Sequence, residues 1–143
     1  MSKVIETLFY SKLGQSLLSA AGVKPAIELN RYKGESPWVN GPTLLASSAT
    51  PELSEILDLA HIQHNTWQQQ TSLFGGALFD ATTSSTMLYL AILKDFFSQA
   101  GKRLTPSSHV VILGISPLSC HSIGQAAVME ALNGFTRSLA KEL

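Results

Sequence analysis

His109-Val-Val-Ile-Leu-Gly-Ile115 is the strongest strand signal in this chain. Its aliphatic residues run almost without a break, and such a run is typical of a strand buried on both faces of a parallel sheet. Three shorter apolar runs precede it and are further candidate strands, at residues 43–48, 62–66 and 76–80. The sequence therefore predicts a sheet to which this chain contributes four strands.

Helical segments alternate with these strands, at residues 50–60, 84–100 and 122–143. The first has the clearest start, because Thr50 can act as an N-cap and Pro51 fits the first helical position. Ser84 or Ser85 can cap the second helix. This order predicts an α/β fold: an open, mostly parallel, Rossmann-like or flavodoxin-like three-layer sandwich with right-handed crossovers and an extra N-terminal helix.

The first 42 residues are predicted to form a separate unit. Apolar residues at spacings of three and four predict a helix that ends before Gly22 and docks onto the main body, since an isolated helix of this length is only marginally stable. An irregular connector follows. The predicted domains are thus residues 1–42, helix and connector, and residues 43–143, an α/β domain truncated before its last strand or strands.

Few residues of this chain are charged, and this low charge excludes some kinds of partner. Only 14% of the residues are charged, and ten Lys plus Arg balance ten Asp plus Glu. Without a basic patch there is no electrostatic basis for binding nucleic acid. The longest uncharged stretch, residues 104–129, is interrupted by prolines and glycines, so no membrane span is expected. One cysteine and the lack of a signal peptide predict a cytoplasmic protein.

In folds of this class, ligands bind at the loop after the first strand. Here that loop contains no glycine, Pro51 lacks an N–H donor, and Glu52 places a carboxylate where a phosphate would sit. No cofactor is therefore predicted for this chain. A flavodoxin-like alternative stays open, in which the hydroxyl-rich loop Ser47–Thr50 holds a flavin or an acyl group.

No catalytic or metal-binding set of residues stands out. His61 and His64 lie at a helix end and are interpreted as surface histidines without an acidic partner. Cys120 and His121 are adjacent but lack a third group that would orient them. Asp80 ends a strand and is interpreted as a cap for the following turn.

The C-terminal helix carries the most specific resemblance to a known family. Gly134-Phe-Thr-Arg-Ser-Leu-Ala-Lys-Glu-Leu143 resembles the end of the active-site helix of short-chain dehydrogenases/reductases, in particular 3-oxoacyl-acyl-carrier-protein reductases. Residues 110–116 are similar to the strand that leads to the catalytic serine of that family. The rest, including residues 76–82, resembles the degenerate N-terminal domain of its high-molecular-weight members. The resemblance implies a module that precedes a reductase domain using NADPH or NADH in fatty acid metabolism.

The departures from that family bear on activity. The family's chemistry needs a tyrosine and a lysine four residues apart, because the lysine lowers the pKa of the tyrosine. The tyrosine position falls on Gln125 and the lysine position falls on Met129, whereas Ser116 could match the catalytic serine of the family. The family's Asn-Asn-Ala-Gly motif is replaced by Asp80-Ala81-Thr82. The chain is therefore expected to be inactive alone and to serve in assembly or in support of the reductase domain of its parent protein.

Two stripes on the last helix form the predicted interface. One is expected to pack on the sheet and the other on a second subunit, giving a homodimer through the last helices, or on a C-terminal reductase domain. The larger side chains are Val128, Leu132, Phe135 and Leu139, and the small ones include Ala127 and Ala131.

Overall fold

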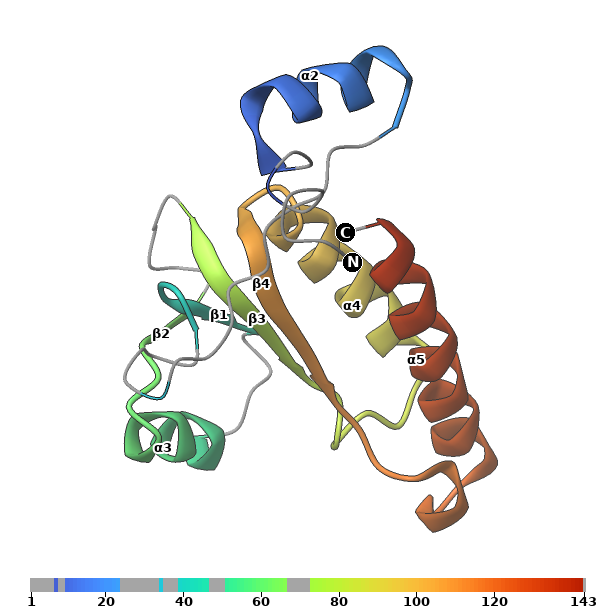
Figure 1. The fold of residues 1–143 in the computed structure, drawn as a ribbon. Coiled ribbons are helices and arrows are strands. Elements are labelled where there is room, and N and C mark those ends of the chain that lie inside the picture. Colours follow the sequence, from blue (N-terminus) through green and yellow to red (C-terminus); the bar gives the residue numbers. More distant parts are fainter. Residues whose placement is uncertain are drawn as a thin grey trace.

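The computed structural model describes residues 7, 10–23, 34, 39–46, 51–66 and 73–142. At its centre is a parallel sheet of four strands in the order β2-β1-β3-β4 (Figure 1). The strands are β1 (Thr43–Leu45), β2 (His64–Thr66), β3 (Phe74–Asp80) and β4 (Leu104–Leu113). The α/β class predicted from the sequence, an open Rossmann-like or flavodoxin-like sandwich, is confirmed.

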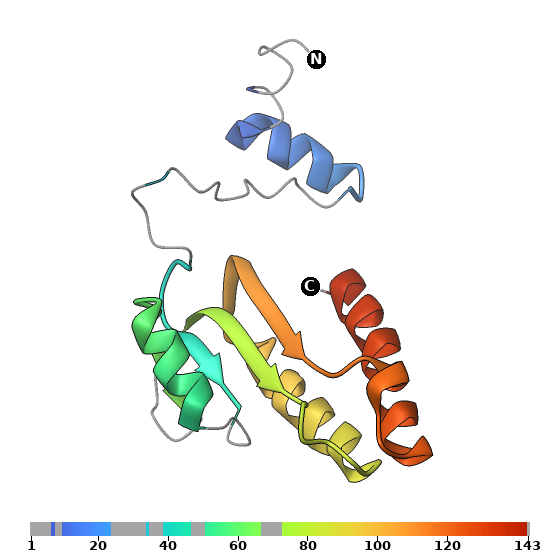
Figure 2. The same ribbon diagram turned by 90° about the horizontal axis from the view of Figure 1, so that it is seen from below.

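Helices cover the two faces of this sheet. Helix α3 (Pro51–Leu59) lies on one face, and α4 (Leu88–Ala100) and α5 (Ile123–Glu142) lie on the other (Figures 1 and 2). Side chains alternate along each strand between the faces. One core, between the sheet and α4 and α5, therefore includes Leu44, Ala77 and Phe79, whereas a smaller core beneath α3 includes Leu45, Leu57 and Leu78.

Strand β3 is the centre of the fold, and all seven of its residues are buried. Two glycines near its start allow the chain before β1 to pass close by. A Cβ atom on Gly75 would lie 2.2 Å from the carbonyl oxygen of Asn40, so only glycine fits there. Contact with the α/β body thus begins a few residues before Thr43, the first residue of the predicted domain.

The expectation that residues 109–115 form a strand buried on both faces is wrong. Residues 109–113 of this stretch form the second half of β4, which lies at the edge of the sheet, and Val111 is 43% exposed. The first half of β4 is irregular: the register with β3 shifts between Phe74 and Gly76, and Ser107 has a φ of 61°. The run is apolar because one face packs on α4 and α5, but no strand among the described residues covers its outer side.

Helix α4 begins later than predicted, and neither Ser84 nor Ser85 caps it. Its first residue is Leu88, and the N-cap position falls on Met87, which makes no side-chain capping bond. Ser84 is fully buried instead, and its hydroxyl has no hydrogen-bond partner in the described part of the chain. The first turn of α4 is tight, because the N–H groups of Tyr89 and Leu90 bond to carbonyls three residues earlier.

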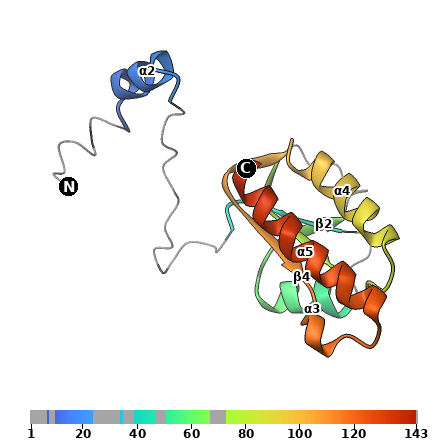
Figure 3. The same ribbon diagram turned by 90° about the vertical axis from the view of Figure 1, so that its right-hand side faces the viewer.

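Helix α2 (Lys12–Ala20) falls within the predicted N-terminal helix. Ser11 caps it by accepting a hydrogen bond from the N–H of Gly14 at 3.1 Å. Figure 3 draws α2 as a helix of its own, in which Leu13 is 79% exposed, and its docking onto the main body stays a prediction. Most of the predicted connector and the loop Ser47–Thr50 lie outside the described residues.

Candidate functional site

The carboxyl edge of the sheet, where ligands bind in folds of this class, brings two loops together. One follows β3, and the other follows β4 and includes the short 3-10 helix η1 (Pro117–Ser119). The N–H of Ala81 donates to the carbonyl of Leu113 at 2.9 Å and joins the two loops at their base. The loop after β1, which carries the predicted flavin or acyl site, lies outside the described residues.

Asp80 is buried at this edge, and its carboxylate is occupied by the next turn. One oxygen, Oδ1, accepts hydrogen bonds from the N–H of Thr82 at 2.9 Å and from its hydroxyl at 2.7 Å. This arrangement is an Asx turn, in which the side chain stands in for a backbone acceptor. The prediction that Asp80 caps the following turn is confirmed.

Gln125, at the position that the resemblance gives to a tyrosine, organises the start of α5. Its side-chain oxygen accepts the N–H of His121 at 3.0 Å, and its own N–H donates to the hydroxyl of Ser122 at 3.1 Å. This pairing resembles a capping box, which satisfies N–H groups that a helix start leaves free. Cys120 is held nearby, where its thiol donates to the carbonyl of Ser116 at 3.5 Å.

Met129, at the position that the resemblance gives to a lysine, is a packing residue. It is 3% exposed, and its sulfur accepts the N–H of Ile115 at 3.4 Å. The same sulfur would lie 3.2 Å from a Cβ on Gly114, so the side chain fills the space beside that glycine. Gln125 and Met129 therefore serve to start α5 and to pack it against the end of β4.

A cavity of about 300 Å³ lies between the end of β4 and α5. Two of its polar side chains bond within α5: Thr136 donates to the carbonyl of Leu132 at 2.8 Å, and Asn133 donates to Glu130 at 3.4 Å. No titratable side chain is among those that form its wall, so this cavity offers no acid or base. Its lining residues are Ile112, Gly114, Ile115, Ser116, Pro117, Met129, Leu132, Asn133 and Thr136.

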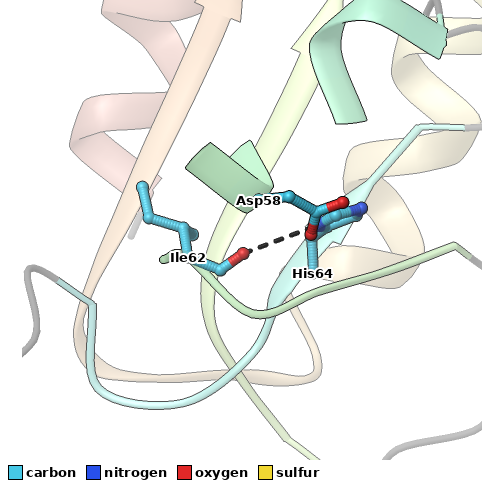
Figure 4. A network of polar contacts seen from close by, with 3 residues as sticks. All are labelled: Asp58, Ile62 and His64. Carbon is cyan, nitrogen blue, oxygen red and sulfur yellow. Dashed lines mark hydrogen bonds and ion pairs between the residues drawn. The ribbon is translucent and has the colours of Figure 1, made fainter. Parts of the chain in front are cut away.

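The prediction that the His61 and His64 pair lacks an acidic partner is wrong for His64. Its Nδ1 lies 3.7 Å from Oδ1 of Asp58 and 3.3 Å from the carbonyl oxygen of Ile62 (Figure 4). The turn after α3 reverses the chain and brings the helix end back to the start of β2. His64 is the first residue of β2 and pairs with Thr43, so this group lies at the amino edge of the sheet, away from the ligand edge.

The predicted interface stripes on α5 have different surroundings. Val128 and Leu132 are buried inside the chain, and the Phe135 ring lies 5.5 Å from that of Phe97 on α4. Leu139 packs against the same core. The stripe of larger side chains therefore faces α4 and the sheet. On the other stripe Ala127 is exposed and Ala131 is half-buried.

No group of three or more His, Cys, Asp and Glu side chains in the described ranges could hold a metal ion. No helix of those ranges is both long and apolar enough to cross a membrane. The fold is a parallel α/β sandwich in which Gln125 and Met129 have structural roles. No protein-family model and no curated protein sequence matches the chain.

Proposed function

We propose that this chain is a non-catalytic α/β module of a 3-oxoacyl thioester reductase of the short-chain dehydrogenase/reductase family. In this role it supports assembly of a reductase domain that binds NADPH or NADH, and it acts in the cytoplasm. The observation that carries the proposal is the use of Gln125 and Met129, the family-like positions for a tyrosine and a lysine, in capping and packing.

The chemistry of these side chains supports a module without its own reductase activity. An amide does not exchange a proton with a substrate oxygen at neutral pH, and a thioether carries no charge that would assist an acid. The carbonyl of Ser116 accepts a hydrogen bond from the thiol of Cys120, and no titratable side chain lines the nearby cavity. Reduction in the parent protein is therefore assigned to the partner domain, with its own cofactor.

One face of helix α5 is the surface through which this module joins its partner. Ala127 and Ala131 belong to the stripe that does not face the core, and Gly134 has no atom within 4 Å of the place where a Cβ would be. Small side chains let a second helix approach closely. A low overall charge leaves such an approach without strong repulsion. The partner is a second copy of the chain, or the reductase domain itself.

Activity is tested by incubating the purified chain with NADPH or NADH and an acetoacetyl thioester. The expected rate of cofactor oxidation equals that of a blank without protein, and an active short-chain reductase serves as the positive control. Oxidation above the blank that follows the protein through purification would refute the non-catalytic assignment.

The interface is tested with Ala127→Glu and, as a matched control, Ala140→Glu on a different side of α5. We expect the chain to be a dimer by light scattering and Ala127→Glu to make it monomeric with an unchanged circular dichroism spectrum. Ala140→Glu should stay dimeric. A wild-type chain that is monomeric at about 100 μM, a concentration at which a micromolar dimer would be largely assembled, counts against the second copy as partner.

The strand order supports one alternative, a flavodoxin-like module that binds a flavin or an acyl group. The order β2-β1-β3-β4 is the beginning of the flavodoxin-like order, with its ligand crevice between β1 and β3. Titration with flavin mononucleotide tests this alternative. A rise in melting temperature that saturates would favour it, and a flat titration would remove the flavin form of it.

A further inference from the structure

Two Asn-Gly pairs occur in this chain, at residues 40–41 and 133–134. An asparagine before glycine readily loses its side-chain amide, because the backbone nitrogen of the glycine can attack the side-chain carbonyl carbon. Glycine has no Cβ to shield that nitrogen, and its backbone turns freely into the geometry of attack. Since the two pairs share this chemistry, their surroundings in the fold decide which of them reacts.

The first pair lies in the turn that leads into β1. Asn40 is exposed, and the N–H of Gly41 donates to the carbonyl of Val39 at 3.1 Å. This bond closes a three-residue turn, in which donor and acceptor cannot align as well as they do in a helix. Rotation of the backbone at Asn40 breaks the bond and directs the nitrogen of Gly41 toward the side-chain carbonyl.

The second pair lies inside α5, where each N–H bonds to the carbonyl four residues earlier. The nitrogen of Gly134 is therefore held by the helix. The side chain of Asn133 is held as well, because it donates to Glu130 at 3.4 Å. Attack at this pair requires a local opening of α5, and a packed helix opens rarely. Asn133 should therefore keep its amide.

We propose that Asn40 is a site of spontaneous modification, at which the chain closes to a succinimide and reopens to aspartate or isoaspartate. The nitrogen of Gly41 bonds to Cγ of Asn40, the Cγ–Nδ2 bond breaks, and ammonia leaves with the amide proton of Gly41. Water then opens the ring. Cleavage between Cγ and the nitrogen gives aspartate, whereas cleavage between the backbone carbonyl carbon and the nitrogen gives isoaspartate. This modification is independent of the proposed reductase partner.

The turn itself requires the glycine that makes Asn40 reactive. Gly41 has a φ of 108°, which residues with a Cβ rarely adopt, and it lies beside Gly75 at the start of β3. A side chain at position 41 would protect Asn40 but would strain the entry to β1. The reactive pair is thus tied to the way in which the chain enters the sheet.

The two products differ in where they place the new carboxylate. In aspartate it replaces the exposed side-chain amide. In isoaspartate the backbone runs through the side chain, and the former backbone carbonyl of residue 40 becomes the free carboxylate. That carbonyl packs against Gly75, which is buried. A carboxylate there loses part of its hydration, so isoaspartate should loosen the entry to β1 and aspartate should not.

The experiment keeps the folded full chain at mildly alkaline pH and follows both pairs by peptide mass spectrometry. We expect Asn40 to lose its amide at least roughly tenfold faster than Asn133. In guanidinium chloride, which unfolds α5, the two pairs should react at similar rates. Asn40→Gln should remove most of the acidic forms seen on isoelectric focusing, because the longer side chain cyclises slowly. Asn133→Gln is the matched control and should leave those forms unchanged.

Three results would overturn the proposal. The first is equal rates at the two pairs in the folded chain. The second is an unreactive Asn40 in the folded chain when both pairs react in guanidinium chloride, which would show that the turn protects it. The third concerns the isoaspartate form, separated by chromatography and unfolded with urea. Its midpoint should lie below that of Asn40→Asp, which represents the aspartate product, and equal midpoints would contradict the contact with Gly75.

Discussion

Two side chains on α5 have structural roles that agree with the proposed lack of activity. Gln125 bonds to the turn before the helix, and Met129 packs against the end of β4. Each residue stabilises the junction between β4 and α5, so neither position is free to carry a catalytic group without a structural cost. Asp80 is similar, because its carboxylate closes an Asx turn.

Met129→Lys should destabilise the protein strongly. The side chain is buried, and no acid lines the neighbouring cavity, so an ammonium group there would be desolvated without a partner. We expect a loss of about 3 kcal/mol or more in the free energy of unfolding by urea. Met129→Leu, the control, should cost less than about 1.5 kcal/mol because it keeps the volume. Equal losses in the two variants would contradict this account of the site.

Gly75→Ala and Gly134→Ala should change stability in opposite directions. A Cβ on Gly75 meets the backbone of Asn40, which cannot move as a flexible side chain would. We expect a loss of about 2–4 kcal/mol from this overlap. Gly134 is inside α5 with open space around it, so alanine should add about 0.5–1 kcal/mol by removing the entropy cost of glycine. Urea unfolding of both variants measures the difference, and a stable Gly75→Ala protein would disagree with the close approach.

Helix α3 shows how an element ends without glycine. The N–H of Ile62 donates to the carbonyl of Leu57 at 2.9 Å, and that of His61 donates to Asp58 at 3.0 Å. This is a Schellman motif with His61 in the left-handed region, at a φ of 55°. The motif turns the chain into β2 and brings His64 near Asp58.

His61→Gly should therefore stabilise the protein. Glycine adopts positive φ without the steric cost that a Cβ imposes, and we expect a gain of about 1 kcal/mol in urea unfolding. His61→Ala is the control, and it should give no gain because alanine keeps the Cβ. A similar midpoint for the glycine and alanine variants would mean that strain at this helix end is small.

The apolar pattern of a strand does not always predict its position in the sheet. The segment 76–80 is short and contains two small residues, yet it belongs to β3, which is fully buried. Residues 109–115 have the more apolar pattern, but the strand that they contribute to, β4, is an edge strand that ends at Leu113. A run of apolar residues indicates that a strand is covered by helices. Which strands lie beside it in the sheet depends on the crossovers, and local sequence does not specify these.

The hydrophobic cores of the α/β body include no residue of α2. A chain that begins at residue 24 should therefore melt within about 3 °C of the full chain, because few contacts of the body are lost. Thermal unfolding followed by circular dichroism measures this. A fall of more than about 10 °C would show that α2 stabilises the body in solution.

Local sequence was sufficient for the α/β class, the order of the elements and the turn at Asp80. These follow from apolar periodicity, helix caps and turn residues, which act over a few positions. Only the tertiary structure decided that β3 is an inner strand and that β4 is an edge strand of the sheet. It also decided that Met129 packs α5 against the end of β4. These features depend on contacts between segments distant in the chain, whose partners are selected when the sheet and helices pack together.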